Sequence, residues 1–249
     1  MDKTVICMKW GDLYDAEYVN VLYNAVRANL AEPFRFVCLT DNADGLSPGI
    51  SAFPIPDIGL TPRQWRGGGW PKLSVFIDDL YGLSGRALFI DLDMMVVGDL
   101  QPFFEYGSGL IAIDEGAWKG GPPSTMSSIF AFDIGAHTDL VDRMREDPNA
   151  MEDLYGYEQN FLHGEAERVG YWPNSWLASF KRHLRRPLLL DRILPPKMPA
   201  PNVKIVVFHG LPRPRDLVRS GKGNRDRFPH FIGGPVGWVV AYWNRYVVS

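Results

Sequence analysis

Hydrophobic and polar residues follow two periodicities in the first forty positions of the chain. A short apolar run at Thr4–Met8 has the length and composition of a buried strand, and Phe34–Leu39 forms a second such run. Between them, apolar residues recur every three or four positions and predict a helix that Asp15 can cap and that Glu32-Pro33 ends. This order predicts a β-α-β unit, and therefore a parallel sheet with a right-handed crossover.

Two acidic residues interrupt the next buried strand. The apolar run Ala87–Ile90 is followed directly by Asp91 and Asp93, and apolar character resumes at Met94–Val97. In an extended chain, residues two apart point to the same face, so the two carboxylates converge. Paired carboxylates repel each other unless a hard cation binds between them, and ligands in open α/β sheets gather at the carboxyl ends of strands. The pattern predicts a divalent metal site; the alternative is a pair of turn residues.

The remaining pattern completes an α/β chain. It predicts a helix beginning near Pro71 and a loop around Gly116–Pro123 that we expect to order over a substrate. No repeat or domain boundary is visible, so we predict one α/β domain, residues 1–249, with a central, mostly parallel sheet flanked by helices. The other predicted strands are 110–113, 128–134 and 203–208, and the other predicted helices are 137–145 and 157–166.

Composition excludes several classes of protein. The chain has 249 residues, of which 46% are hydrophobic and 13% aromatic, and this argues against disorder. No apolar stretch approaches the roughly 20 residues of a spanning helix, and MDKTVICMKW does not resemble a signal peptide. We therefore expect a soluble cytoplasmic protein. Cys7 and Cys38 each lie in a predicted strand, so we expect buried free thiols.

Charge is distributed unevenly along the chain. The net charge is −3, but residues 180–230 contain 13 basic and 3 acidic residues, giving +10. Such a segment attracts phosphates or anionic lipid, although it can also be a solvated basic face. Together with the apolar and aromatic tail Val236–Val248, it predicts peripheral association with the inner face of a membrane. The acidic remainder argues against general nucleic-acid binding.

A histidine and a basic turn follow a further predicted strand. His209 follows the predicted strand 203–208 directly, and two carboxylates with one imidazole suit Mn²⁺ or Mg²⁺. Arg213 lies on a proline-stiffened turn, where a guanidinium can bind phosphate oxygens in bidentate fashion. Lys72 and Lys181 are further candidates for phosphate contact, and the alternative for the arginine is a solvent-exposed surface residue.

These residues lie in motifs that resemble a known family. From about residue 4 to residue 216 the chain is similar to bacterial and viral glycosyltransferases of the GT-A fold, in particular glycosyltransferase family eight and its relatives. The Asp-x-Asp motif, the later Glu-Gln pair and the final His-Gly with its basic turn occur in the family's order. The matching segments are TVICMKWGDLYDAEYVNVLYNAV, FRFVCLTDN, GWPKLSVF, LFIDLDMMVVGDL, YEQNFL, WLASFK and VVFHGLPRPRDL.

The resemblance implies transfer of a sugar from a nucleotide-sugar, with a UDP-sugar as first choice, to a glycan or lipid-linked acceptor, as in polysaccharide biosynthesis. It implies that Asp91, Asp93 and His209 hold Mn²⁺ (or Mg²⁺) and that Glu158-Gln159, similar to the family's Asp-Gln pair, lies near the sugar as the catalytic pair. It places nucleotide binding in about residues 1–100 and acceptor binding in about residues 101–249. The residues implied for donor binding are Met8, Trp10, Gly11, Tyr14, Asp41, Lys72, Asp91, Leu92, Gly210 and Arg213.

Other residues carry weaker expectations. Ser127 and Ser128 occupy positions where relatives contact donor or acceptor hydroxyls. Trp118, Trp172 and Trp176 could stack on an acceptor sugar, with a core or loop role as the alternative.

The chain departs from the family at two positions. Glu158 replaces the family's Asp, and Arg213 follows His209 by four residues, whereas the family has a Lys after a longer gap. No residue is evident as a general base, so retention or inversion of the anomeric centre stays open, although the most similar relatives retain.

Two other functions compete with sugar transfer. One is a haloacid-dehalogenase-like phosphatase, but there the Asp-x-Asp motif lies near the N-terminus and is followed two residues later by Thr or Val, where this chain has Met95. The other is a non-catalytic nucleotide-sugar-binding protein.

Overall fold

The computed structural model describes residues 3–219, 230 and 235–247. Contacts between Cα atoms divide the chain into two compact units. Unit 1 comprises Met1–Leu13, Glu32–Asp91 and Gln101–Trp172, and unit 2 comprises Tyr14–Ala31, Leu92–Leu100 and Pro173–Ser249. The functional division near residue 100 that the resemblance implies stays a prediction.

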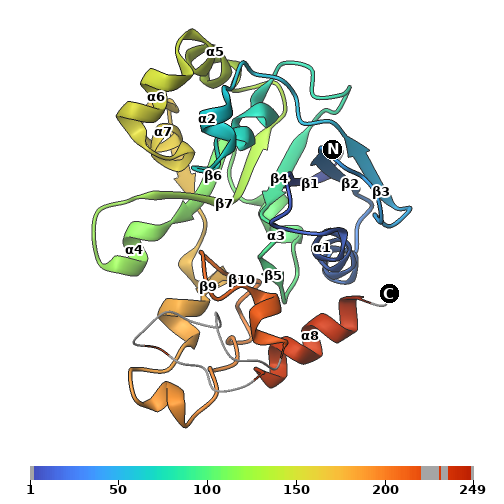
Figure 1. The fold of residues 1–249 in the computed structure, drawn as a ribbon, viewed down its shortest axis with the longest axis vertical. Coiled ribbons are helices and arrows are strands. Elements are labelled where there is room, and N and C mark those ends of the chain that lie inside the picture. Colours follow the sequence, from blue (N-terminus) through green and yellow to red (C-terminus); the bar gives the residue numbers. More distant parts are fainter. Residues whose placement is uncertain (1–2, 220–229, 231–234, 248–249) are drawn as a thin grey trace. The chain divides into compact units, whose positions relative to one another are not determined.

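Unit 1 contains a seven-stranded sheet with the order β3-β2-β1-β4-β7-β6-β8 (Figure 1). Strand β7 runs antiparallel to β4 and β6, and every other neighbouring pair is parallel. The predicted α/β class with a central, mostly parallel sheet is therefore confirmed. The strands are β1 (Lys3–Lys9), β2 (Arg35–Thr40), β3 (Ile50–Phe53), β4 (Arg86–Ile90), β6 (Leu110–Asp114), β7 (Thr125–Asp133) and β8 (Val169–Tyr171).

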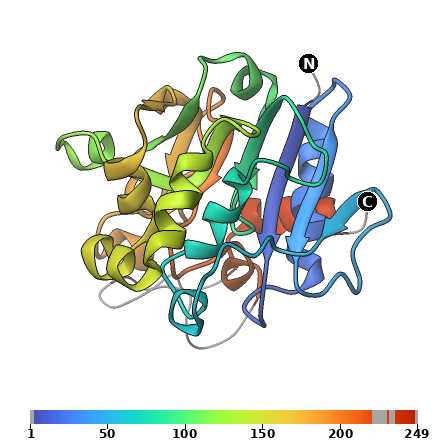
Figure 2. The same cartoon turned by 90° about the horizontal axis from the view of Figure 1, so that it is seen from above.

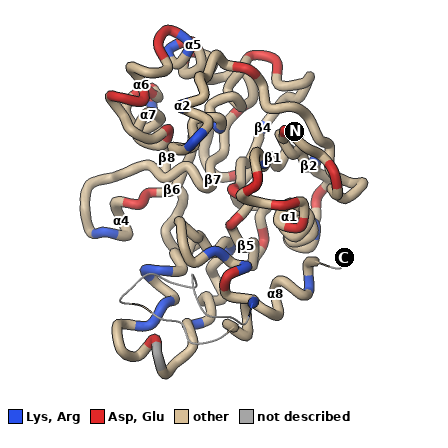
Figure 3. The backbone as a smooth tube through the Cα atoms, in the orientation of Figure 1, with Lys and Arg blue, Asp and Glu red and all other residues tan. Residues whose placement is uncertain are grey.

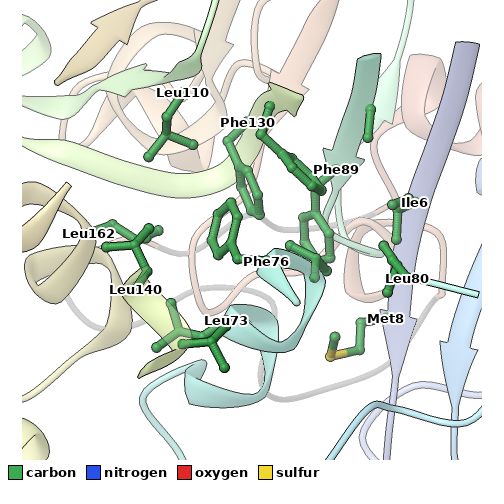
Figure 4. Packing of buried hydrophobic residues seen from close by; sticks show 14 of the residues in the cluster. Ile6, Met8, Leu73, Phe76, Leu80, Phe89, Leu110, Phe130, Leu140 and Leu162 are labelled. Carbon is green, nitrogen blue, oxygen red and sulfur yellow. The ribbon is translucent and has the colours of Figure 1, made fainter. Parts of the chain in front are cut away.

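Helices of unit 1 cover the sheet. Figure 2 shows α5, α6 and α7 gathered on one face. Beneath them, the rings of Phe89 and Phe130 stack with centroids 4.8 Å apart, and Phe76 packs against Phe130 (Figure 4). The helices are α2 (Pro62–Trp65), the 3₁₀ helix η1 (Trp70–Phe76), α3 (Gln101–Glu105), α4 (Glu115–Lys119), α5 (Thr138–Glu146), α6 (Pro148–Tyr155) and α7 (Glu158–Glu165).

Unit 2 combines helices from the two ends of the chain with a small sheet. Helix α1 (Ala16–Asn29) packs against α8 (Gly237–Val247), and Trp243 Nε1 donates a hydrogen bond of 2.8 Å to Glu17 Oε1. Strand β10 (Ile205–Val207) is antiparallel to β5 (Met95–Val96) and parallel to β9 (Leu177–Ser179). The short helices are η2 (Asn174–Trp176), η3 (Phe180–Leu184), η4 (Leu190–Arg192) and η5 (Pro214–Leu217).

The predicted apolar tail forms part of the interior of unit 2. Four side chains of α8 are buried, and the Tyr242 hydroxyl accepts a hydrogen bond of 3.0 Å from the backbone N–H of Val96. The buried residues are Val239, Tyr242, Trp243 and Tyr246. Val248, the last residue of the predicted tail, and 220–229 of the basic segment lie outside the described residues.

The predicted helix near Pro71 is confirmed as a 3₁₀ helix that begins at Trp70 and buries Leu73 and Phe76. Two other local predictions are wrong. The predicted loop after Ile113 contains α4, because the Asp114 carboxylate caps this helix by accepting a hydrogen bond of 3.1 Å from the Ala117 N–H. Asp15 occupies the N-cap position of α1, but its carboxylate makes no cap hydrogen bond and pairs with Arg215.

Cys7 and Cys38 are buried free thiols, as predicted. Of the helices in the described ranges, none combines the length and apolar character that crossing a bilayer demands.

Candidate functional site

Lys72 lies between two carboxylates at the carboxyl end of β4. Asp91 follows the strand directly, and Lys72 extends from η1 so that its Nζ lies 2.8 Å from Asp91 Oδ2. The same Nζ lies 3.6 Å from Oε1 of Glu158, the first residue of α7. All three side chains are mostly buried. Their charges therefore interact more strongly than they would at a solvent-exposed surface. This group is the Lys72 cluster of unit 1.

Glu158 is the buried member of the cluster. It is only 4% exposed, and its Oε1 accepts a hydrogen bond from the Ser127 hydroxyl. Burial raises the pKa of Glu158, while the Lys72 ammonium and hydrogen bonds from Ser127 and the Gln159 backbone act in the opposite direction. The structure therefore brings the predicted catalytic Glu158 together with the predicted phosphate contact Lys72 and with Ser127.

A glycine turn holds Glu158 in place. The Glu158 backbone N–H donates a hydrogen bond of 3.0 Å to Gly68 O. Gly69 has φ +73°, and a Cβ there would lie 2.5 Å from Glu158 Oε2. Both the backbone conformation and the close approach of the carboxylate therefore require glycine at this position.

Replacing Gly69 by alanine is expected to lower the free energy of unfolding by about 2 kcal/mol, because the new methyl group displaces Glu158 and the left-handed conformation disfavours a side chain. Gly67→Ala is the matched control, since a Cβ at Gly67 meets nothing within 4 Å. Urea unfolding of both variants provides the measurement. Equal stabilities for the two variants would contradict the described packing.

The candidate nucleobase residues of unit 1 lie at the carboxyl ends of β1 and β2. The Gly11 N–H donates a hydrogen bond of 2.8 Å to Asp41 Oδ2, and Lys9 Nζ lies 3.8 Å from Asp41 Oδ1. The Met8 side chain packs in the hydrophobic core, and Trp10 is partly buried against it. Lys9 was not among the predicted residues, although its place directly after an apolar run, like that of Asp91, is a usable signal.

In unit 2, the buried Asp93 contacts Tyr14, which is partly exposed. Asp93 is 8% exposed, and its Oδ2 accepts a hydrogen bond of 2.9 Å from the Tyr14 hydroxyl. The Arg213 guanidinium lies 5.3 Å from the centroid of the Tyr14 ring. Leu92 is buried. The structure thus groups three predicted residues, Tyr14, Asp93 and Arg213, around one aromatic ring.

His209 lies where two parallel strands of unit 2 end. Val207 pairs with Ser179 in the register of β10 and β9, and the Ser179 hydroxyl lies 2.8 Å from His209 Nε2. Lys181 Nζ donates a hydrogen bond of 2.6 Å to His209 O, next to Gly210, which has φ +69°. Ser179 was missed by the sequence reasoning because its strand is only three residues long.

The predicted metal ligands are divided between the two units. Asp91 belongs to unit 1, whereas Asp93 and His209 belong to unit 2, and their contacts are with Lys72, Tyr14 and Ser179 respectively. Within 3–219, 230 and 235–247, no three or more His, Cys, Asp or Glu side chains are grouped so that they could hold a metal ion. The donor set of two carboxylates and an imidazole still has the chemistry that Mn²⁺ or Mg²⁺ accepts, so the three-ligand site stays a prediction.

The tryptophans proposed for acceptor stacking differ in exposure. Trp172 is buried, packs edge-on against Phe103 and donates a hydrogen bond of 3.2 Å from Nε1 to Ile129 O, so it is a core residue. Trp176 is partly exposed with Lys204 Nζ 5.6 Å from its ring centroid, and Trp118 is partly exposed in α4. Ser128 contributes its backbone, which accepts a hydrogen bond of 2.9 Å from the Asp91 N–H.

Comparison with known proteins identifies the fold. No protein-family model and no curated protein sequence matches the chain. Among solved structures, the galactosyltransferase LgtC in complex with donor and acceptor sugar analogs is similar, with 15% identity, a TM-score of 0.58, and coverage of 99% of this chain and 97% of LgtC.

Two further structures are similar over the whole of this chain. The bifunctional glycosyltransferase WbbM has 13% identity and a TM-score of 0.59, with 50% of its own chain covered. The glycosyltransferase GlyE of Streptococcus pneumoniae TIGR4 has 14% identity and a TM-score of 0.59, with 61% of its own chain covered. The chain therefore has the GT-A fold that the sequence motifs predict.

Proposed function

We propose, from this GT-A fold, that the chain is a metal-dependent glycosyltransferase that moves a sugar from a nucleotide-sugar donor to a hydroxyl of an acceptor. The donor is a UDP-sugar, and the acceptor is a glycan or a lipid-linked sugar at the inner face of the cytoplasmic membrane. The observation that carries the proposal is the Lys72 cluster, in which an ammonium and two enclosed carboxylates meet at the carboxyl end of β4. Ligands of open α/β sheets bind at this edge.

In the proposed reaction the bond between the sugar and the diphosphate breaks, and negative charge develops on the departing diphosphate. Asp91, Asp93 and His209 would hold Mn²⁺ or Mg²⁺, which when bound neutralises charge growing on the leaving group. Arg213 would bind the diphosphate as well, because its Nε is buried and lacks a hydrogen-bond acceptor among the residues that the structure describes. A buried N–H without an acceptor destabilises the folded state, because it has lost its hydrogen bonds to water. A phosphate oxygen would supply the missing acceptor.

Glu158 and Gln159 would face the transferred sugar. The enclosed Glu158 carboxylate is fixed by Ser127 and by Lys72, so it can accept hydrogen bonds from sugar hydroxyls without moving. Lys72, already paired with Asp91, would add positive charge on the donor side.

The nucleotide would bind beside the ends of β1 and β2. Aromatic surface for the nucleotide would come from Trp10, a backbone turn from Gly11 and a hydrogen-bond acceptor from Asp41. Met8 would take part through its backbone, because its side chain is in the core. Tyr14, Leu92 and Gly210 complete the proposed donor site. The fold supports sugar transfer over the phosphatase alternative, and release of free sugar or of product separates an enzyme from a non-catalytic binder.

Calorimetric titration of UDP into metal-free protein, with and without Mn²⁺, tests the donor site. We expect binding that strengthens at least about tenfold with Mn²⁺ and that loses this gain in His209→Ala, because one ligand is removed. His163→Ala is the control, since His163 lies on α7 and pairs with Thr125 outside the proposed metal site. Binding of UDP that is indifferent to Mn²⁺ in the unmodified protein would contradict the metal assignment.

A further inference from the structure

Exposed apolar side chains concentrate in one short segment of unit 2. Of the eleven large hydrophobic residues that are exposed among those described, six lie within residues 188–198. Ile193 is 79% exposed and Met198 is 72% exposed. Single exposed leucines are ordinary, but a contiguous group marks a surface that contacts another apolar phase. The group consists of Leu188, Leu189, Leu190, Ile193, Leu194 and Met198.

Basic residues lie before, between and after these apolar residues in the sequence, and the one acidic residue is buried. Residues 180–200 contain six Lys or Arg and a single acid, Asp191. The described basic residues are drawn in blue in Figure 3. Asp191 is 4% exposed, and its Oδ2 lies 2.7 Å from Nδ1 of His230. Among the described side chains of 180–200, the charges at the surface are therefore all positive.

Hydrogen bonds close the segment into a loop with a fixed base. The Lys197 N–H donates a hydrogen bond of 2.8 Å to the carbonyl of the buried Leu184, and Arg186 Nε donates one of 3.0 Å to Pro195 O. At the far end, Leu189 has φ +79°, a conformation that disfavours leucine and accumulates at functional turns. The leucines are thus presented by a closed loop, which we call the leucine loop (185–198).

We propose that the leucine loop docks the protein on an anionic lipid bilayer, with its aliphatic side chains in the interface and its basic side chains at the lipid phosphates. Long basic side chains reach the headgroups while their stems stay in apolar surroundings. A second copy of the chain fits less well, because two facing loops would bring like charges together. The loop also lacks the Tyr and Trp that are typical of the centre of a protein interface.

This surface differs from the one that the sequence predicted. The apolar face of α8 is buried inside unit 2, so it is already occupied by the protein itself. The basic segment keeps its predicted role, but the apolar contribution comes from 188–198 in place of the tail.

Sedimentation with vesicles tests the proposal without any sugar donor, so its outcome is independent of the proposed transferase activity. The full chain is mixed with vesicles of phosphatidylcholine alone or with phosphatidylglycerol added. We expect binding to the anionic vesicles that falls about tenfold in the double variant Ile193→Ser/Met198→Ser. Lys197→Gln is expected to bind about fivefold more weakly to anionic vesicles only, since one basic residue near such a surface is worth ~1 kcal/mol.

Matched controls separate the loop from general surface changes. Leu154→Ser removes a leucine of α6 that is 69% exposed, close to the value for Met198. Arg168→Gln removes an exposed charge outside the loop, and both variants should bind like the unmodified protein. Circular dichroism confirms that each variant is folded. Unchanged vesicle binding in Ile193→Ser/Met198→Ser would overturn the proposal. A second outcome would also overturn the proposal: the protein does not bind vesicles but self-associates, and Ile193→Ser/Met198→Ser abolishes the self-association. The loop would then be a contact between copies of the chain.

Discussion

Asp93→Asn is expected to lower the rate of sugar transfer about a thousandfold and to leave the unfolding temperature nearly unchanged. The amide oxygen of asparagine can still accept the hydrogen bond from Tyr14, so the packing of the enclosed side chain is retained. The negative charge, however, is lost, and a neutral amide is a weaker ligand for a hard cation. Initial rates with a UDP-sugar and Mn²⁺, together with a thermal unfolding scan, measure the two effects.

Two control variants test whether the loss of transfer rate in Asp93→Asn is specific to Asp93. Asp99→Asn removes an exposed acidic charge six residues further along unit 2 and should keep full activity. Tyr14→Phe removes only the hydroxyl that contacts Asp93, so we expect a loss of no more than about tenfold. Full activity of Asp93→Asn would show that Asp93 holds no metal, and an equal loss in Asp99→Asn would show that net charge alone is responsible.

Lys72→Met is expected to lower the free energy of unfolding by about 3 kcal/mol, or roughly 10 °C in the unfolding temperature. The substitution keeps the aliphatic stem but leaves Asp91 and Glu158 without their shared ammonium. Removal of one partner from an enclosed charged group is costly because the other charges stay desolvated. Lys72→Arg retains the charge and should recover most of the loss; a loss equal to that of Lys72→Met would assign the effect to packing.

The stability of Lys72→Met should also depend on pH in a defined direction. Burial raises the pKa of Glu158, so the folded state holds a proton that the unfolded state has already released. Stability of the folded state therefore falls as pH rises from the unfolded pKa of Glu through the folded value. Because Lys72 opposes this shift, its removal should enlarge the fall. Urea unfolding at several pH values measures the slope, and a variant that gains stability with rising pH across this range would contradict the assignment.

The elements that sequence predicts best are those with strong local patterns. β1, β2 and β4 were predicted because each is a short apolar run that is almost wholly buried. Helix α1 was predicted because its apolar residues recur every three or four positions and form one buried face. Helix α4 was missed because its glycine and the prolines after it predict a loop, whereas a single capping carboxylate at Asp114 is sufficient to start it.

The candidate site divides in the same way. Asp91 and Asp93 are two residues apart in the sequence, so their pairing could be predicted from the sequence. The contacts of Lys72 with Glu158 and of His209 with Ser179 could not be predicted in this way. These partners are 86 and 30 residues apart and meet only through the arrangement of strands and helices. Met8 follows the same logic, since an apolar residue at a strand end can face either a ligand or the core.

The chain passes between the two units five times, and this order has a consequence for biosynthesis. Helix α1 ends at Asn29, whereas α8, which covers part of its apolar face, begins only at Gly237 and is therefore synthesised much later. At ordinary rates of translation, α1 waits roughly 10 to 45 s for its partner. Until α8 is synthesised, the part of this face that α8 covers stays exposed, and exposed apolar surface of this kind is prone to aggregation. A chain released before residue 237 would lack the helix that covers it.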